Sequence, residues 1–159
     1  RAVLVQAYKD AFNDLRGPYG NAELSPMFAG AREALLHLHA QPETLLAVAT
    51  GKSKRGPDKM IERHGLEGLF ISQQVADFHP SKPHHAMVLA ALSDTGVAPN
   101  RAVMLGDTSY DMDMGRAGGV GTIGVSWGYH DAATIGADIV IDSFDALPNA
   151  IDRLTGTTI

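Results

Sequence analysis

The segment VMLGDTSYDMDMGRAGG, residues 103–119, decides the fold of this 159-residue chain. It begins with an apolar run typical of a buried strand, and that strand delivers Asp107 into a tight turn. A helix N-cap follows at Thr108 or Ser109, and a Gly-Gly pair ends the helix. Since ligand sites of open α/β sheets lie at the carboxyl ends of strands, Asp107 is a candidate site residue.

Asp111 follows Asp107 by one helical turn, so both carboxylates can face the same point. Two neighbouring carboxylates repel each other unless a cation lies between them, and Mg²⁺ prefers such oxygens. We therefore predict that Asp107 and Asp111 hold Mg²⁺. The alternative is that Asp107 caps the helix and Asp111 only stabilises its positive end. Asp113 should point away from this site and either pair with Arg116 or face solvent.

Strand and helix patterns alternate along the rest of the chain. This alternation predicts an α/β fold, with a parallel sheet that carries helices on both faces. The predicted strands are residues 44–50, 70–76, 102–107, 121–126 and 138–141, and further helices are expected at 30–40, 57–64, 83–95 and from Phe144 onward.

Residues 2–16 are predicted to form a helix, because their apolar side chains follow a helical stripe at Val5, Tyr8, Phe12 and Leu15. The turn-forming residues after this helix indicate a linker.

Composition excludes several classes of protein. With 45% apolar residues the chain can bury the core of one domain, and its net charge of −5 argues against a nucleic-acid partner. The absence of cysteine excludes disulfides and thiolate zinc sites and is compatible with a cytoplasmic enzyme. No apolar run is long enough to span a membrane. His79, His84 and His85 do not have the spacing of a zinc site.

Four stretches together resemble the haloacid dehalogenase (HAD) superfamily, in the order that the superfamily requires. GDTSYD at 106–111 resembles its fourth motif, LLAVATGKS at 45–53 its second, and PSKPHHAMV at 80–88 its third. GVSWGYHDA at 124–132 resembles the closing part of phosphoglycolate phosphatase-like members. The resemblance implies a HAD-like Rossmannoid sheet over residues 26–159, with residues 1–25 as the remnant of a helical cap and its linker.

The first motif of the superfamily, DxDx[TV], does not occur in this sequence. That motif supplies the nucleophilic aspartate at the tip of the first strand, so the resemblance implies that the first central strand is missing. We expect the chain to be the carboxyl-terminal portion of a longer protein. The resulting slot should be filled by an N-terminal segment, by a second chain or by rearranged strand pairing, since a central strand leaves two open edges.

Phosphate-binding groups are expected at the ends of two other predicted elements. Thr50 ends a strand, so its hydroxyl and the N–H groups of Gly51 and Lys52 can converge on phosphate oxygens. The resemblance implies that Lys82, placed by Pro83 at a helix entry, offsets the charge of phosphate and nucleophile.

The implied activity is that of a Mg²⁺-dependent phosphatase acting on a small phosphorylated metabolite through an aspartyl-phosphate, with the nucleophile outside this chain. A phosphosugar mutase would use the same residues. A non-catalytic fragment that binds phosphate or a partner is the other alternative, and the chain alone should be inactive.

Overall fold

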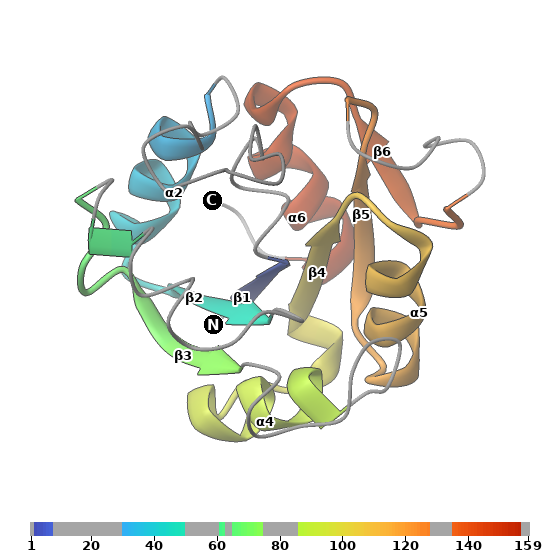
Figure 1. Ribbon diagram of the computed structural model, residues 1–159, viewed down its shortest axis with the longest axis horizontal. Helices are drawn as coiled ribbons and strands as arrows, with labels where there is room; N and C mark the ends of the chain where they lie inside the picture. The colour runs from blue at the N-terminus through green and yellow to red at the C-terminus, as the bar shows by residue number, and fades with distance from the viewer. Residues whose placement is uncertain are drawn as a thin grey trace, which may run out of the picture.

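The computed structural model describes residues 2–7, 30–49, 61–62, 65–74, 86–127 and 135–156. These residues build a sheet with the strand order β3-β2-β1-β4-β5-β6 (Figure 1). The strands are β1 (Ala2–Ala7), β2 (Thr44–Ala49), β3 (Phe70–Gln74), β4 (Ala102–Gly106), β5 (Gly121–Val125) and β6 (Ile139–Ile141). All neighbouring strands are parallel, so their carboxyl ends share one edge of the sheet.

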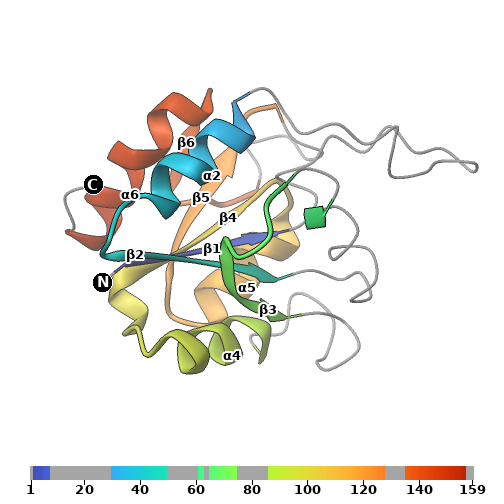
Figure 2. The same cartoon turned by 90° about the vertical axis from the view of Figure 1, so that its left-hand side faces the viewer.

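Helices cover both faces of this sheet, as the sequence predicts. Figure 2 shows α2 (Ala31–His39) and α6 (Leu147–Thr155) on one face and α4 (Ala86–Thr95) and α5 (Ser109–Ala117) on the other. Short 3₁₀ helices, η2 (Pro99–Arg101) and η3 (Phe144–Ala146), precede β4 and α6. None of the helices in the described part of the chain is long and apolar enough to cross a membrane.

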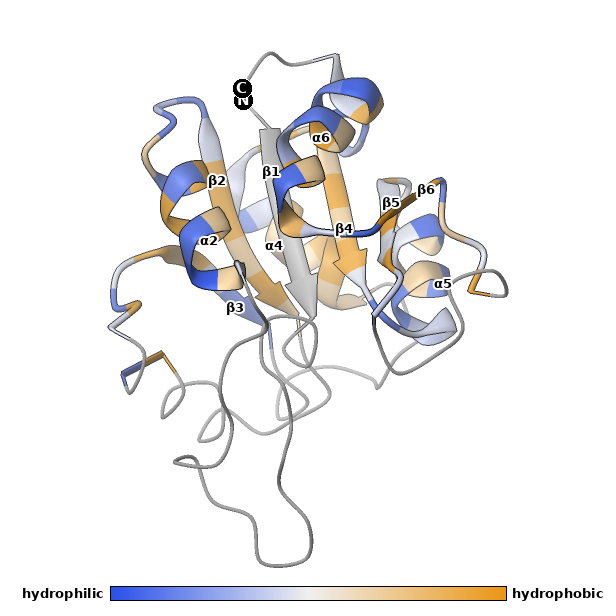
Figure 3. Cartoon of the chain, turned by 90° about the horizontal axis from the view of Figure 1, so that it is seen from above, coloured by the Kyte–Doolittle hydropathy of each residue, from blue (hydrophilic) through white to orange (hydrophobic). Residues whose placement is uncertain are grey.

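Strand β4 shows how the helices on the two faces are packed against the sheet. Val103 and Leu105 are fully buried in the cluster that contains α2 and α6 residues. Ala102 and Met104 alternate with them and are buried in the cluster under α4 and α5. Parallel strands covered on both faces are apolar throughout, and β2 and β4 both have this colouring in Figure 3. The apolar run that predicts a strand in the sequence therefore lies at the centre of the core.

The prediction of a helix at the N-terminus is wrong for residues 2–7. These residues form β1, which pairs with β2 from Ala2 to Ala7 and with β4 from Val3 to Gln6. The prediction that the first central strand is missing is therefore wrong too, because this chain itself fills the position between β2 and β4. A short apolar run fits a buried strand as well as a helix, and the open edges of β2 and β4 favour the strand.

The other predicted elements agree with the structure where it describes them. Strands β4 and β5 each end one residue earlier than predicted, β6 begins one residue later, and the last helix is preceded by a 3₁₀ turn at Phe144. Residues 8–29, which include the rest of the predicted cap helix and the domain boundary at 25/26, lie outside the described residues. Of the helix predicted at 57–64, only Ile61 and Glu62 are described, and both are helical.

Candidate active site

Asp107 lies directly after the last residue of β4 and is only 3% exposed. The strand register determines what lies beside it. Gln6 of β1 pairs with Val48 in β2 and with Leu105 in β4, so these three strands end side by side. Strand β2, which ends at Ala49, therefore reaches the same edge of the sheet as β4. This is the edge on which the sequence places its phosphate-binding and metal-binding residues.

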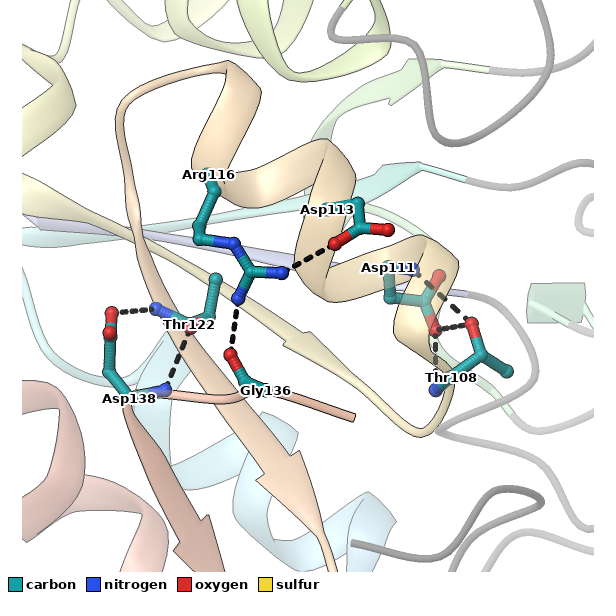
Figure 4. A network of polar contacts seen from close by, with 7 residues as sticks. All are labelled: Thr108, Asp111, Asp113, Arg116, Thr122, Gly136 and Asp138. Atoms are coloured by element: carbon teal, nitrogen blue, oxygen red, sulfur yellow. Dashed lines mark hydrogen bonds and ion pairs between the residues drawn. The ribbon is translucent and has the colours of Figure 1, made fainter. Parts of the chain in front are cut away.

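A capping box organises the turn between β4 and α5 (Figure 4). Thr108 is the N-cap, and its Oγ1 accepts a hydrogen bond from the Asp111 N–H at 3.2 Å. One oxygen of the Asp111 carboxylate, Oδ2, accepts two hydrogen bonds in return. They come from the Thr108 N–H at 3.2 Å and from Thr108 Oγ1 at 3.0 Å. The Asp107 N–H also donates to Oδ2, at 3.2 Å. One buried carboxylate thus fixes the backbone of the whole turn.

Gly106 makes this packing possible. A Cβ atom at this position would lie 2.3 Å from Asp111 Cβ and 2.7 Å from Asp111 Oδ2. Both distances are far below van der Waals contact, so the Asp111 side chain occupies the space that any other residue at position 106 would need. The occurrence of Gly106 with Asp111 in the sequence motif therefore has a steric basis.

The two acidic residues have different surroundings. Asp111 is 1% exposed, and its Oδ2 receives three donors, two from Thr108 and one from the Asp107 N–H. The Oδ1 atom of Asp107 is buried with no hydrogen-bond partner among the described residues. Burying two neighbouring carboxylates, Asp107 and Asp111, is costly unless positive charge offsets theirs.

These two residues fit a hard cation. Mg²⁺ keeps several waters and needs few protein carboxylates. The described residues contain no cluster of three or more His, Cys, Asp or Glu placed for a metal, and the candidate ligands among them are the pair Asp107 and Asp111. Which of them contacts the ion stays a prediction.

Asp113 and Arg116 form the ion pair that the sequence predicts, on the exposed side of α5. The Arg116 guanidinium also donates to the backbone carbonyl of Gly136 (Figure 4). Asp113 therefore supports, through Arg116, the contact of α5 with the segment before β6.

The segment before β6 has a second anchor, on β5. The Thr122 N–H donates to Asp138 Oδ2 at 3.0 Å, and the Asp138 N–H donates to Thr122 Oγ1 at 2.9 Å. Thr122 is fully buried whereas Asp138 is exposed, so these two part-buried bonds join the core to the surface segment before β6.

The predicted phosphate-binding residues Thr50, Gly51, Lys52 and Lys82 lie outside the described residues, as do His79, His84 and His85. Sequence reasoning did not identify the second contact of Thr108, the one to the Asp111 carboxylate. The signal was available, because Thr-x-x-Asp before a helix has the spacing of a capping box.

Comparison with known proteins identifies the family. The model of the family "Haloacid dehalogenase-like hydrolase" matches residues 2–125. "Probable phosphatase IndB" of Dickeya dadantii is 35% identical over 133 residues, which cover 80% of this chain and 57% of that protein. "Phosphoglycolate phosphatase" of Chromobacterium violaceum is 32% identical over 127 residues, covering 79% and 57%. The chain thus spans little more than half the length of these relatives.

A solved structure shows the same fold. The HAD-superfamily hydrolase of subfamily IA, variant 1, from Geobacter sulfurreducens has a TM-score of 0.78 at 16% identity, over 94% of this chain and 98% of that one. Because the family model matches most of the chain, from β1 through β5, the chain belongs to the haloacid dehalogenase-like hydrolase family.

Proposed function

We propose that the protein containing this chain is a Mg²⁺-dependent phosphatase that hydrolyses a small phosphorylated metabolite. Membership of the hydrolase family and the phosphatase names of two relatives support the reaction class. The name of the relative from Chromobacterium violaceum makes phosphoglycolate the first substrate to test.

One observation carries the proposal: a buried carboxylate, Asp107, stands at the carboxyl end of a central parallel strand with the Asp111 carboxylate on the next helical turn. Phosphoryl transfer depends mainly on positioning and on offsetting negative charge. When bound, Mg²⁺ would offset the charge of the transferred phosphoryl group. Asp107 would hold the ion directly, and Asp111 directly or through water.

The remaining roles are assigned to residues that the structure does not describe. The Thr50 hydroxyl and the N–H groups of Gly51 and Lys52 would donate to the phosphate oxygens. Lys82 would offset the charge of the phosphate and of the attacking carboxylate. In-line attack by an aspartate outside these 159 residues would break the ester P–O bond and give an aspartyl-phosphate, which water then hydrolyses.

A second candidate function is phosphate binding without turnover. The sequence favours it, because DxDx[TV] is absent and no aspartate lies within Ala2–Ala7, the strand at the centre of the sheet. Positioning groups without a nucleophile can bind phosphate but cannot form the covalent intermediate.

The natural reading frame that contains this chain separates the two candidates. DxDx[TV] upstream of Arg1 would favour the phosphatase. The test is orthophosphate release from phosphoglycolate by the protein made from that frame, with and without Mg²⁺. Release that requires Mg²⁺ and is lost in Asp107→Asn supports the proposal. Phosphate binding by the same protein without any release would favour the non-catalytic function. Transfer of the phosphoryl group to a sugar hydroxyl would identify a mutase.

A further inference from the structure

Thr108 lies between the two acidic residues in sequence and makes two contacts with the second of them. Its Oγ1 accepts from the Asp111 N–H at 3.2 Å and donates to the Asp111 carboxylate at 3.0 Å (Figure 4). The first contact is an ordinary helix cap. The second goes beyond capping, because it holds a side chain that the proposed metal centre needs.

The contacts on Asp111 all converge on the same atom. Oδ2 accepts from Thr108 Oγ1, from the Thr108 N–H and from the Asp107 N–H, at 3.0–3.2 Å. Three donors on one oxygen fix the rotation of the carboxylate and therefore the direction in which its other oxygen points. Among these donors, Thr108 Oγ1 is the only one that comes from a side chain, so a substitution can remove it without changing the backbone.

The same network also fixes Asp107. Its N–H donates to Asp111 Oδ2, so the Asp111 carboxylate also holds the backbone of Asp107. Gly106 closes the arrangement from the strand side, where Asp111 packs directly against the backbone. A movement of the Asp111 carboxylate would therefore change the position of both predicted ligands.

We propose that Thr108 is the positioning residue of the cation site, orienting the Asp111 carboxylate through its hydroxyl. This inference rests on the proposed metal centre. Mg²⁺ requires ligands near ideal octahedral positions, so a carboxylate that rotates freely binds it less well. Partners that orient metal ligands typically change metal affinity by about 10–100-fold when they are removed.

The variants separate orientation from helix capping. Thr108→Ser keeps a hydroxyl at the same place, whereas Thr108→Val removes both contacts at nearly constant volume. Thr108→Gly also removes the hydroxyl, but glycine is a tolerable N-cap that costs a helix only a few tenths of a kcal/mol. Thr95→Val is the matched control, since it removes a hydroxyl that bonds Ala91 and Leu92 carbonyls on α4. Any Mn²⁺ binding that remains in Asp107→Asn measures binding outside the site.

The experiment titrates Mn²⁺, a hard divalent probe, into the 159-residue chain and follows the EPR signal of the free ion. Circular dichroism checks folding. We expect Mn²⁺ binding that Asp107→Asn abolishes, and a dissociation constant about 10–100-fold higher in Thr108→Val and Thr108→Gly. Thr108→Ser and Thr95→Val should bind as the unchanged chain does. If Thr108→Val does not fold, Thr108→Gly decides.

Two results would overturn the inference, and they are distinguishable. Unchanged affinity in Thr108→Gly would show that the site forms without the hydroxyl, and the metal centre itself would stand. No Mn²⁺ binding by the unchanged chain would remove the metal centre and the role of Thr108 together.

Discussion

Asp111 fills the space that a side chain at position 106 would occupy, so this turn accommodates Asp111 only when residue 106 is Gly106. This steric relationship joins the last residue of β4 to the first turn of α5. It places the end of the strand, the helix cap and the two acidic residues in one rigid unit. Each part can be tested separately.

Replacement of Gly106 by alanine should disrupt this unit. A Cβ at 2.3 Å from Asp111 Cβ forces the helix or the strand to shift, and overpacking of this kind costs about 1–3 kcal/mol. We expect a lower free energy of unfolding in urea and weaker Mn²⁺ binding. Gly121→Ala is the control, since its Cβ would lie 3.2 Å from the side chain of Leu154. Equal losses in both variants would contradict the steric argument.

The placement of β1 predicts a pattern of hydrogen exchange. Val3 to Gln6 have strand partners on both sides, in β2 and β4. Amides in a central strand open only with the core of the domain. We expect the amides of residues 3–6 to exchange as slowly as those of Val103 to Leu105. Fast exchange at 3–6, or helical carbon chemical shifts there, would contradict the strand.

Asp107, directly after β4, and Asp113, on α5, should differ in their importance for the cation. Asp107→Asn removes a buried charge at the site and should abolish Mn²⁺ binding. Asp113→Ala removes a half-exposed ion pair with Arg116, which is worth about 0.2–1 kcal/mol of stability, and should leave Mn²⁺ affinity unchanged. EPR titration of both variants measures the difference. Similar losses would mean that the site faces the other side of α5.

Thr122→Val should destabilise the fold away from the candidate site. It removes the acceptor of the Asp138 N–H at a residue that is fully buried. Because Asp138 is exposed and the bond is part-buried, its loss should cost about 0.5–1.5 kcal/mol, which urea denaturation resolves. Thr122→Ser keeps the acceptor and should recover most of this loss. A valine variant as stable as the unchanged chain would show that the hydrogen bond from the Asp138 N–H to Thr122 Oγ1 contributes nothing to stability.

The 159-residue chain by itself should release no orthophosphate from p-nitrophenyl phosphate or from phosphoglycolate. Its sequence lacks the DxDx[TV] motif, and a covalent intermediate cannot form without the nucleophile. A colorimetric phosphate assay in the presence of Mg²⁺ checks this. Turnover that Mg²⁺ supports and Asp107→Asn abolishes would overturn the expectation and would point to a nucleophile within the chain.

The local patterns predicted most of this structure. Residues 103–119 carry an apolar run, N-cap residues and a glycine pair, and the strand, turn and helix follow from those neighbours in sequence. The N-terminal strand could not be predicted in the same way. Val5 fits a helical stripe and a strand equally well, and the preference for a strand comes from β2 and β4, which lie far away in the sequence.

The candidate site was predictable to a similar extent. The spacing of Asp107 and Asp111 places both at one strand end, and the structure has them there, buried. The spacing does not say that Oδ2 of Asp111 receives three donors, since two of these are backbone groups whose positions depend on the folded turn. Thr50 and Lys82 stay predictions.

The central place of β1 has a consequence for biosynthesis. Its partner in β4 begins about 95 residues later in the chain, so the ribosome makes β1 well before the sheet can close around it. At about 5–20 residues per second, this interval lasts roughly 5–20 s. During that time an apolar segment has no completed sheet to enter, and nascent-chain chaperones have time to bind it.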